Sequence, residues 1–120
     1  MSKNKKRALI VEDDPSLARI FPRFLGALGW SATVISNADA ALRVFEPGRY
    51  DLALIGVGLG DGMDGVALAG CLRNREPSLR IMLTSGDPSS LVRAEGAGFH
   101  LCLPQPFTQE ELQALIESPA

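Results

Sequence analysis

The stretch "YDLALIGVGLGDGMDGVAL", residues 50–68, passes from a continuous apolar run into a loop rich in glycine and aspartate. The apolar run at residues 52–57 has the length of a strand and no polar position, which is typical of a strand buried on both faces of a parallel sheet. The loop contains the letters G-x-G-x-x-G between Gly60 and Gly65, a pattern found in dinucleotide-binding turns. The stretch therefore predicts a buried strand with a candidate functional loop at its carboxyl end.

Apolar runs of this kind alternate with helical patterns along the whole chain. Because parallel strands need a crossover, usually a helix, between them, five such units predict a doubly wound α/β domain. It has a five-stranded parallel sheet with helices on both faces. The runs lie at residues 8–11, 31–35, 52–57, 80–83 and 99–103.

Helix boundaries are marked by capping residues. Asp14 and Asp87 each stand before a proline, so each offers an N-cap carboxylate followed by proline at the first helical position. The spacing of a capping box occurs at Ser36 with Asp39 and at Thr108 with Glu111. In the first predicted helix an apolar stripe at i, i+3, i+4 spacing is expected to face the core. It consists of Leu17, Ile20, Phe21, Phe24, Leu25 and Leu28.

Length and charge limit the function classes. The 120 residues are expected to form a single domain, and a net charge of −2 argues against direct binding to nucleic acid. No apolar run approaches the roughly 20 residues that a membrane span needs, and no signal peptide is visible. Residues 1–6 form a basic leader, interpreted as solvated, with a contact to an acidic partner as the alternative.

The two cysteines and the single histidine offer no metal or disulfide framework. Cys71 falls in a predicted helix and Cys102 in a predicted strand, so a reducing, cytoplasmic location is the simplest interpretation. Cys102 is expected to be a small buried hydrophobe. His100 has no cysteine or histidine cluster around it that would suggest zinc.

Polar residues gather where the predicted strands end. Two acids follow the first strand, a Thr-Ser pair ends the fourth, and a Pro-Gln-Pro turn follows the fifth. Doubly wound folds place their sites outside the carboxyl ends of the strands. These side chains are therefore expected to meet in one site.

With these residues at its strand ends, the whole chain resembles the receiver domain of two-component response regulators. The resemblance rests on "ALIVEDDPSLARIF", "YDLALIGVGLGDGMDGVAL", "IMLTSGD" and "GFHLCLPQPFTQEEL", each at the expected strand–helix junction. It implies a flavodoxin-like sheet with strand order 2-1-3-4-5. It also implies a pocket in which Mg²⁺, held by carboxylates and a backbone carbonyl, assists transfer of a phosphoryl group from a histidine kinase to an aspartate.

Carried over by position, part of that pocket is present. The acid pair corresponds to Glu12 and Asp13, with Asp13 as the expected main metal ligand, and the carbonyl ligand corresponds to Gly58. The hydroxyl at the end of the fourth strand corresponds to Thr84. Its alternative role is an ordinary turn hydroxyl, and without a phosphate to bind this is the favoured interpretation.

Three positions that serve activation in the family depart together. Gly56 stands at the phosphoacceptor position, Gln105 at the lysine position and Cys102 at the aromatic switch position. Glycine has no nucleophile, and a neutral glutamine cannot pair with a phosphate. Losing one carboxylate and one ammonium together leaves the net charge of the pocket unchanged, which suggests that the two losses are coupled.

The expected function is therefore a phosphorylation-independent docking module. The alternative is phosphorylation or metal regulation through another acid, namely Asp61, Asp64 or Asp13. Asp61 and Asp64 lie beyond the strand, so neither replaces a group at position 56 unless the loop refolds.

No cofactor is expected to be required, and Mg²⁺ binding is expected to be weak because one carboxylate is missing. Two solvated carboxylates at Glu12 and Asp13 are the alternative to a weak metal site.

A flavin- or nucleotide-binding domain is the main rival class. Against it, Asp61 and Asp64 place two negative charges in a loop that would have to receive a pyrophosphate.

The expected partners are proteins, with a homodimer through the face formed by the fourth helix, fifth strand and fifth helix as one possibility. Leu91, Val92 and Phe99 belong to that face, although each also fits the core. An output domain beyond residue 120 is compatible with the family.

Overall fold

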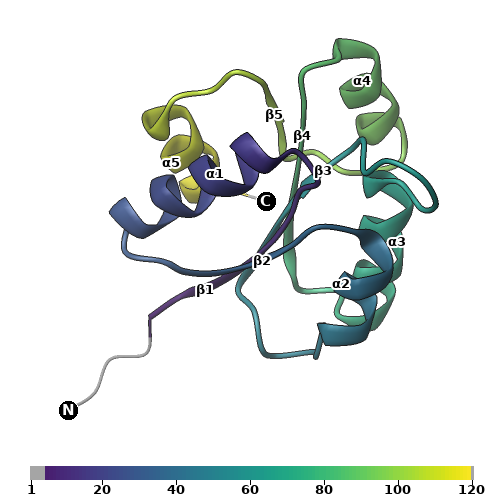
Figure 1. The fold of residues 1–120 in the computed structure, drawn as a ribbon, viewed down its shortest axis with the longest axis horizontal. Helices are drawn as coiled ribbons and strands as arrows, with labels where there is room; N and C mark the ends of the chain where they lie inside the picture. The colour runs from purple at the N-terminus through teal and green to yellow at the C-terminus, as the bar shows by residue number, and fades with distance from the viewer. Residues whose placement is uncertain (1–4, 120) are drawn as a thin grey trace.

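The computed structural model describes residues 5–119 as ten elements in strict alternation (Figure 1). The basic leader falls mostly outside these residues, so most of that prediction is left open. The strands are β1 (Arg7–Val11), β2 (Ser31–Ile35), β3 (Leu52–Gly56), β4 (Arg80–Ser85) and β5 (Cys102–Pro104). The helices are α1 (Pro15–Ala27), α2 (Ala38–Val44), α3 (Gly65–Arg75), α4 (Pro88–Gly96) and α5 (Gln109–Glu117).

All strand pairs are parallel, and the sheet order is β2-β1-β3-β4-β5. This confirms the predicted doubly wound, flavodoxin-like fold. The central strand β3 pairs with β1 and β4, so each of its five residues is buried. A strand flanked on both sides and covered on both faces has no polar position, which explains the continuous apolar run.

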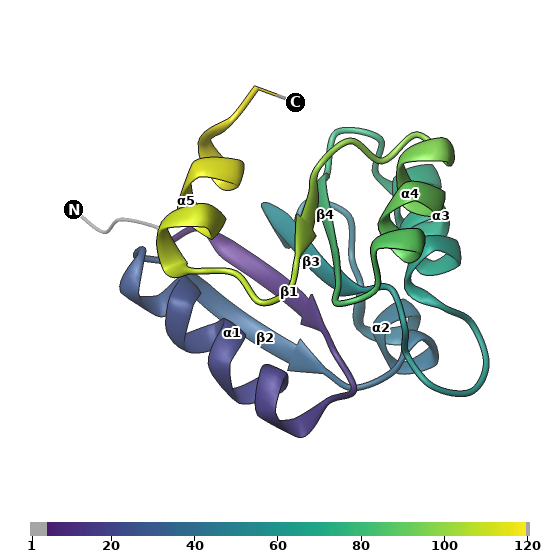
Figure 2. The same cartoon turned by 90° about the horizontal axis from the view of Figure 1, so that it is seen from above.

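The sheet has α1 and α5 on one face and α2, α3 and α4 on the other (Figure 2). It separates two hydrophobic cores. Alternate residues of a strand point to opposite faces, so Leu54 packs with α1 and α5 while Ile55 packs with α2, α3 and α4. From the helices, Phe21, Leu25 and Leu112 fill the first core. The smaller residues of α2 and the leucines of α3 fill the second.

Most predicted helix starts are confirmed. Asp14, Asp87 and Thr108 each accept backbone N–H bonds as N-caps, and Thr108 forms a capping box with Glu111. The predicted box at Ser36 is wrong, because Asn37 caps α2 by accepting the N–H of Ala40 at 2.8 Å.

Two other expectations need correction. The run at 99–103 is not wholly a strand: Phe99 lies in the turn after α4, where its N–H bonds to Ala94, and only Cys102 begins β5. In α1, Ile20 is 39% exposed, so the buried stripe is narrower than the spacing suggested. The other five stripe residues are buried or packed against the core.

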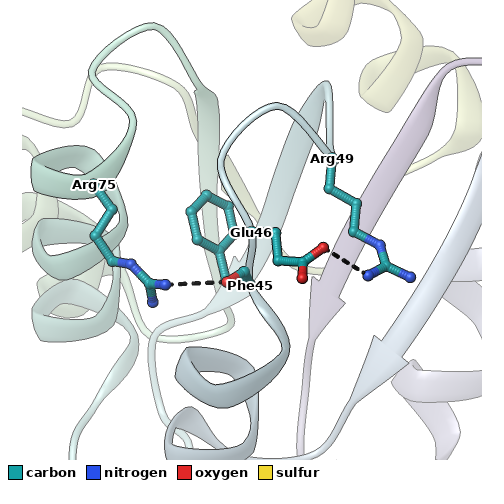
Figure 3. A network of polar contacts seen from close by, with 4 residues as sticks. All are labelled: Phe45, Glu46, Arg49 and Arg75. Atoms are coloured by element: carbon teal, nitrogen blue, oxygen red, sulfur yellow. Dashed lines mark hydrogen bonds and ion pairs between the residues drawn. The ribbon is translucent and has the colours of Figure 1, made fainter.

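The amino edge of the sheet is braced by α3. Arg75 donates to the carbonyl oxygens of Leu42 (3.0 Å) and Phe45 (3.1 Å), and its guanidinium lies over the Phe45 ring. Figure 3 shows this contact beside the exposed ion pair of Arg49 with Glu46 at 2.9 Å. The brace holds the α2–β3 connection, and therefore the start of β3, against α3.

Candidate functional site

The carboxyl ends of β1, β3 and β4 surround an open pocket of about 230 Å³. Six of the predicted site residues meet there. They are Glu12, Asp13, Gly56, Gly58, Thr84 and Gln105. Cys102 lies in a neighbouring groove, and neither Asp61 nor Asp64 lines the pocket.

The side chain of Glu12 is turned into the space beside Gly56. A Cβ atom added at Gly56 would lie 2.6 Å from Oε1 of Glu12, well inside any normal contact distance. Glu12 is only 4% exposed. Its Oε2 accepts the N–H of Asp14 at 3.1 Å, whereas Oε1 is buried with no hydrogen-bond partner within residues 5–119.

This environment changes the acidity of Glu12. Burial raises the pKa of its carboxyl to about 7, the charge of Asp13 adds to the rise, and the Asp14 N–H opposes it. A buried carboxyl group keeps its proton to higher pH because the charged form loses hydration. Near neutral pH, a large fraction of Glu12 is therefore an uncharged carboxylic acid.

Asp13 and Asp14 have different surroundings. Asp14 accepts the N–H groups of Ser16 (2.8 Å) and Leu17 (3.2 Å) through Oδ1, so it caps α1. Asp13 is exposed, and its Oδ2 would lie 3.4 Å from a Cβ at Gly60, so it faces the β3–α3 loop. Both acids are exposed, but it is Asp14 that caps α1.

Thr84 and Gln105 are joined by hydrogen bonds. The buried Thr84 hydroxyl donates to the carbonyl oxygen of Leu103 at 2.6 Å. The Gln105 side-chain amide donates to Thr84 Oγ1 at 3.2 Å. The hydroxyl proton of Thr84 is therefore used within the fold, consistent with a structural role for Thr84.

The glycine-rich loop is built around the start of α3. Asp64 caps the helix by accepting the N–H of Ala67 at 2.9 Å, and it pairs with Arg93 of α4 at 3.0 Å. Gly65 packs so closely on the carbonyl group of Gly56 that any Cβ there would overlap it. The first turn of α3 is thus occupied by a carboxylate and by the end of β3, and it offers no cradle for a pyrophosphate.

A second hollow of about 360 Å³ lies between α4 and β5 and shares Ser85, Gly86 and Gln105 with the first. Cys102 lines this hollow and is only partly buried, so the expectation of a buried residue is wrong. Its thiol donates to the Phe99 carbonyl oxygen at 3.3 Å. Burial raises the pKa of the Cys102 thiol, so it stays protonated. Val92, at the rim, is 67% exposed, whereas Leu91 and Phe99 belong to the core.

The pocket residues do not fit Mg²⁺ well. Divalent cations of this kind need several accessible, charged oxygen ligands. Glu12 points Oε1 into the Gly56 space and accepts the Asp14 N–H through Oε2, and Asp14 caps α1 through Oδ1. Asp13 is therefore the pocket carboxylate least engaged in other contacts, and it lies in the same pocket as Gly58. Within residues 5–119, no group of three or more His, Cys, Asp or Glu side chains is placed to hold a metal.

Some contacts at the site had no signal in the sequence. The pair of Arg93 with Asp64 joins two helices, and the turn of Glu12 toward Gly56 depends on a neighbouring strand. A carboxylate next to a glycine in adjacent strands is the pattern that would have suggested the second contact. Nothing local distinguishes Arg93 from other exposed arginines.

The family model for the response regulator receiver domain matches residues 8–117. The chain belongs to this family. Curated relatives include the DNA-binding transcriptional regulator NtrC of Salmonella typhimurium, 32% identical over 90% of the chain but 23% of that protein. The heme response regulator HssR of Staphylococcus aureus is 33% identical over 88% of the chain and 47% of that protein. The receiver domain thus spans a quarter to a half of these relatives.

Solved structures agree with the fold. A CheY-like receiver domain from Methylobacillus flagellatus superimposes with a TM-score of 0.83 at 27% identity, covering 95% of this chain and 98% of its own. A putative response regulator from Chloroflexus aurantiacus gives a TM-score of 0.84 at 25% identity, covering 95% and 96%. In this chain, no helix of residues 5–119 is long and apolar enough to cross a membrane.

Proposed function

We propose that this receiver domain acts as a phosphorylation-independent docking module in a two-component pathway, in the cytoplasm and without catalytic activity of its own. The observation that carries the proposal is position 56, which has no nucleophile and whose side-chain space holds the Glu12 carboxyl. Phosphotransfer requires an aligned nucleophile and a cation near the developing charge. Gly56 supplies no nucleophile, and Gln105 carries no charge.

The alternative acids have structural reasons to be poor acceptors. Asp64 is engaged with the N-terminus of α3 and with Arg93. Asp61 is exposed in the loop and does not line the pocket. Asp13 lies in the pocket, but no lysine lines that pocket with it. Phosphorylation at any of the three would be the result that contradicts the proposal.

Incubation with acetyl phosphate and Mg²⁺, followed by intact-mass spectrometry, is the direct test. The wild-type domain is expected to stay unmodified. The double variant Gly56→Asp/Gln105→Lys serves as the matched positive control, because it restores the acceptor and the ammonium group at once. An acid-labile phosphorylated species of the wild type would overturn the proposal, and peptide mapping would identify the acceptor.

Mg²⁺ is proposed to be dispensable. Any residual binding would use Asp13, the Gly58 carbonyl and water, because Glu12 is turned into the Gly56 space. A cation held by one carboxylate is bound weakly. We propose that the regulatory signal arrives through protein contacts instead.

The face formed by α4, β5 and α5 is the proposed docking surface. Exposed Val92 and the adjoining groove give it apolar area, and proteins, including a second copy of this chain, are the proposed partners. Sedimentation of wild type and Val92→Glu tests the homodimer, with Val44→Glu, on α2, as control for adding a charge at an exposed valine. Dissociation by Val92→Glu alone is expected; a wild type that stays monomeric at high concentration would rule out the dimer.

Relatives such as NtrC, a DNA-binding transcriptional regulator, are several times longer than this chain. We propose that contacts with an output domain, on the same or another chain, transmit the signal. With a net charge of −2, the receiver domain is not proposed to touch nucleic acid itself.

A further inference from the structure

The space of the missing side chain at position 56 is filled. Glu12 Oε1 lies 2.6 Å from where a Cβ would stand, so residue 56 can carry a side chain only if Glu12 moves away. The glycine and the inward turn of Glu12 are therefore two parts of one arrangement.

Glu12 is also tied into the surrounding structure. Its other oxygen accepts the N–H of Asp14, the residue that caps α1, and the side chain is almost completely removed from solvent. The carboxyl thus connects the end of β1, the start of α1 and the end of β3. A group that waits for a cation would instead keep its oxygens accessible.

We propose that Glu12 is the built-in occupant of this pocket, where its carboxyl group takes the acceptor position and stabilises the fold rather than binding a ligand. This inference rests on the proposed function, since it assumes that no phosphoryl group has to enter. It explains why loss of the acceptor does not leave a solvent-filled hole at the end of the central strand.

A structural role predicts a particular order of stabilities. Ligand-binding acids crowd like charges together, so their removal often leaves stability unchanged or raises it. A packed side chain behaves differently: truncation leaves a cavity and an unpaired N–H, whereas an isosteric amide keeps both contacts. Glu12→Ala is therefore expected to lower Tm by about 5–10 °C, and Glu12→Gln by much less.

Gly56→Ala and Gly58→Ala form a matched pair for the decisive experiment. Both glycines have φ values that alanine adopts, but a Cβ meets Glu12 only at Gly56 and meets nothing within 4 Å at Gly58. Gly56→Ala is expected to displace Glu12, lower Tm and shift the amide resonance of Asp14 in two-dimensional NMR spectra. Gly58→Ala is expected to leave the Asp14 resonance in place.

Two results would overturn the inference: equal Asp14 shifts in the two alanine variants, or a Glu12→Ala variant as stable as wild type. Both leave the proposed function untouched, because neither reports on phosphorylation. Conversely, acetyl phosphate labelling of wild type at Asp61 would refute the proposed function while leaving the comparison of Gly56→Ala with Gly58→Ala informative. The two failures are thus distinguishable.

Discussion

The side-chain amide of Gln105 donates to the hydroxyl oxygen of Thr84, 3.2 Å away, and Thr84 donates in turn to the carbonyl of Leu103 at 2.6 Å. The two residues belong to different strand ends, so the chain of bonds closes one side of the pocket. The resemblance to receiver domains implies that the residues at these two positions contact a phosphoryl group. In this chain they are hydrogen-bonded to each other.

The contributions of these two hydrogen bonds to the free energy of unfolding should differ, and urea unfolding of single variants measures each of them. Thr84→Val leaves the buried Leu103 carbonyl without its donor, and it is expected to lower the free energy of unfolding by about 1–3 kcal/mol. Gln105→Ala removes a partly exposed bond and should lower it by about 0.5–1 kcal/mol. Thr84→Ser, which keeps the hydroxyl, is the control. A larger loss for Gln105→Ala than for Thr84→Val would show that the order of importance is reversed.

Stability should depend on pH through Glu12. Because its pKa is raised from 4.5 to about 7 in the fold, the folded state binds more protons than the unfolded chain between these values. The free energy of unfolding should therefore fall as pH rises from about 4.5 through 7, by about 1–3 kcal/mol for this one group, and level off above. Urea titrations across this range measure it.

Glu12→Gln supplies the control for that pH profile. The amide does not titrate, so the variant should lose this part of the slope, and its stability relative to wild type should rise as pH rises from about 4.5 through 7. A slope that is unchanged by Glu12→Gln would assign the pH dependence to other groups.

Mg²⁺ should have little effect on the wild-type domain. Titration to several millimolar is expected to leave the Asp13 and Gly58 amide resonances in place, because Glu12 and Asp14 accept backbone N–H groups and Asp13 by itself binds the ion weakly. The variant Gly56→Asp restores a third acid and should respond at lower Mg²⁺ concentration. A saturable shift of Asp13 in wild type at or below that concentration would contradict the expectation.

The cap at Asp64 should matter more than its ion pair. Asp64→Ala removes the N-cap of α3 and is expected to reduce stability by about 1 kcal/mol. Arg93→Ala breaks only a solvent-exposed pair, which contributes roughly 0–1 kcal/mol. A double-mutant cycle in low and high salt measures the coupling, which should shrink with salt; a cycle that gives several kcal/mol would show a stronger link between α3 and α4.

Two glycines of α3 should respond in opposite directions to alanine. Gly65→Ala drives a Cβ into the Gly56 carbonyl and is expected to destabilise severely, because both partners are backbone. Gly70 lies in the helix interior with nothing within 4 Å of its Cβ position, so Gly70→Ala should stabilise by about 0.5–1 kcal/mol. Thermal unfolding of the two variants and wild type measures both effects. A Gly65→Ala variant as stable as wild type would show that β3 and α3 can move apart.

The fold was predictable because its signals are local. Apolar runs and caps such as Asp14, Asp87 and Thr108 act within a few residues, and together they give the alternation of strands and helices that the structure has. The start of α2 was predicted wrongly because two neighbouring residues, Ser36 and Asn37, can both act as an N-cap, and the structure uses Asn37. Ile20 was misjudged because a 3.6-residue period does not say how wide a face the sheet covers.

The pocket was predictable as a set of residues but not as an arrangement. Strand-end positions placed Glu12, Gly56, Thr84 and Gln105 together, since parallel strands end at one edge. The direction in which the Glu12 side chain turns depends on the space left by the missing side chain of Gly56 in β3, so the residues next to Glu12 in the sequence do not predict it. The same applies to the pairing of Arg93 with Asp64.

The two hydrophobic cores bear on what a docked partner can do. Strand β5 is one of the two edge strands of the sheet, with α4 packed on one face and α5 on the other, so the sheet keeps their cores apart. A protein that covers α4, β5 and α5 together would clamp both layers from outside and slow amide exchange in each. A small molecule lodged only between α4 and β5 would slow exchange in one layer alone, and the pattern of protection would reveal which kind of partner is bound.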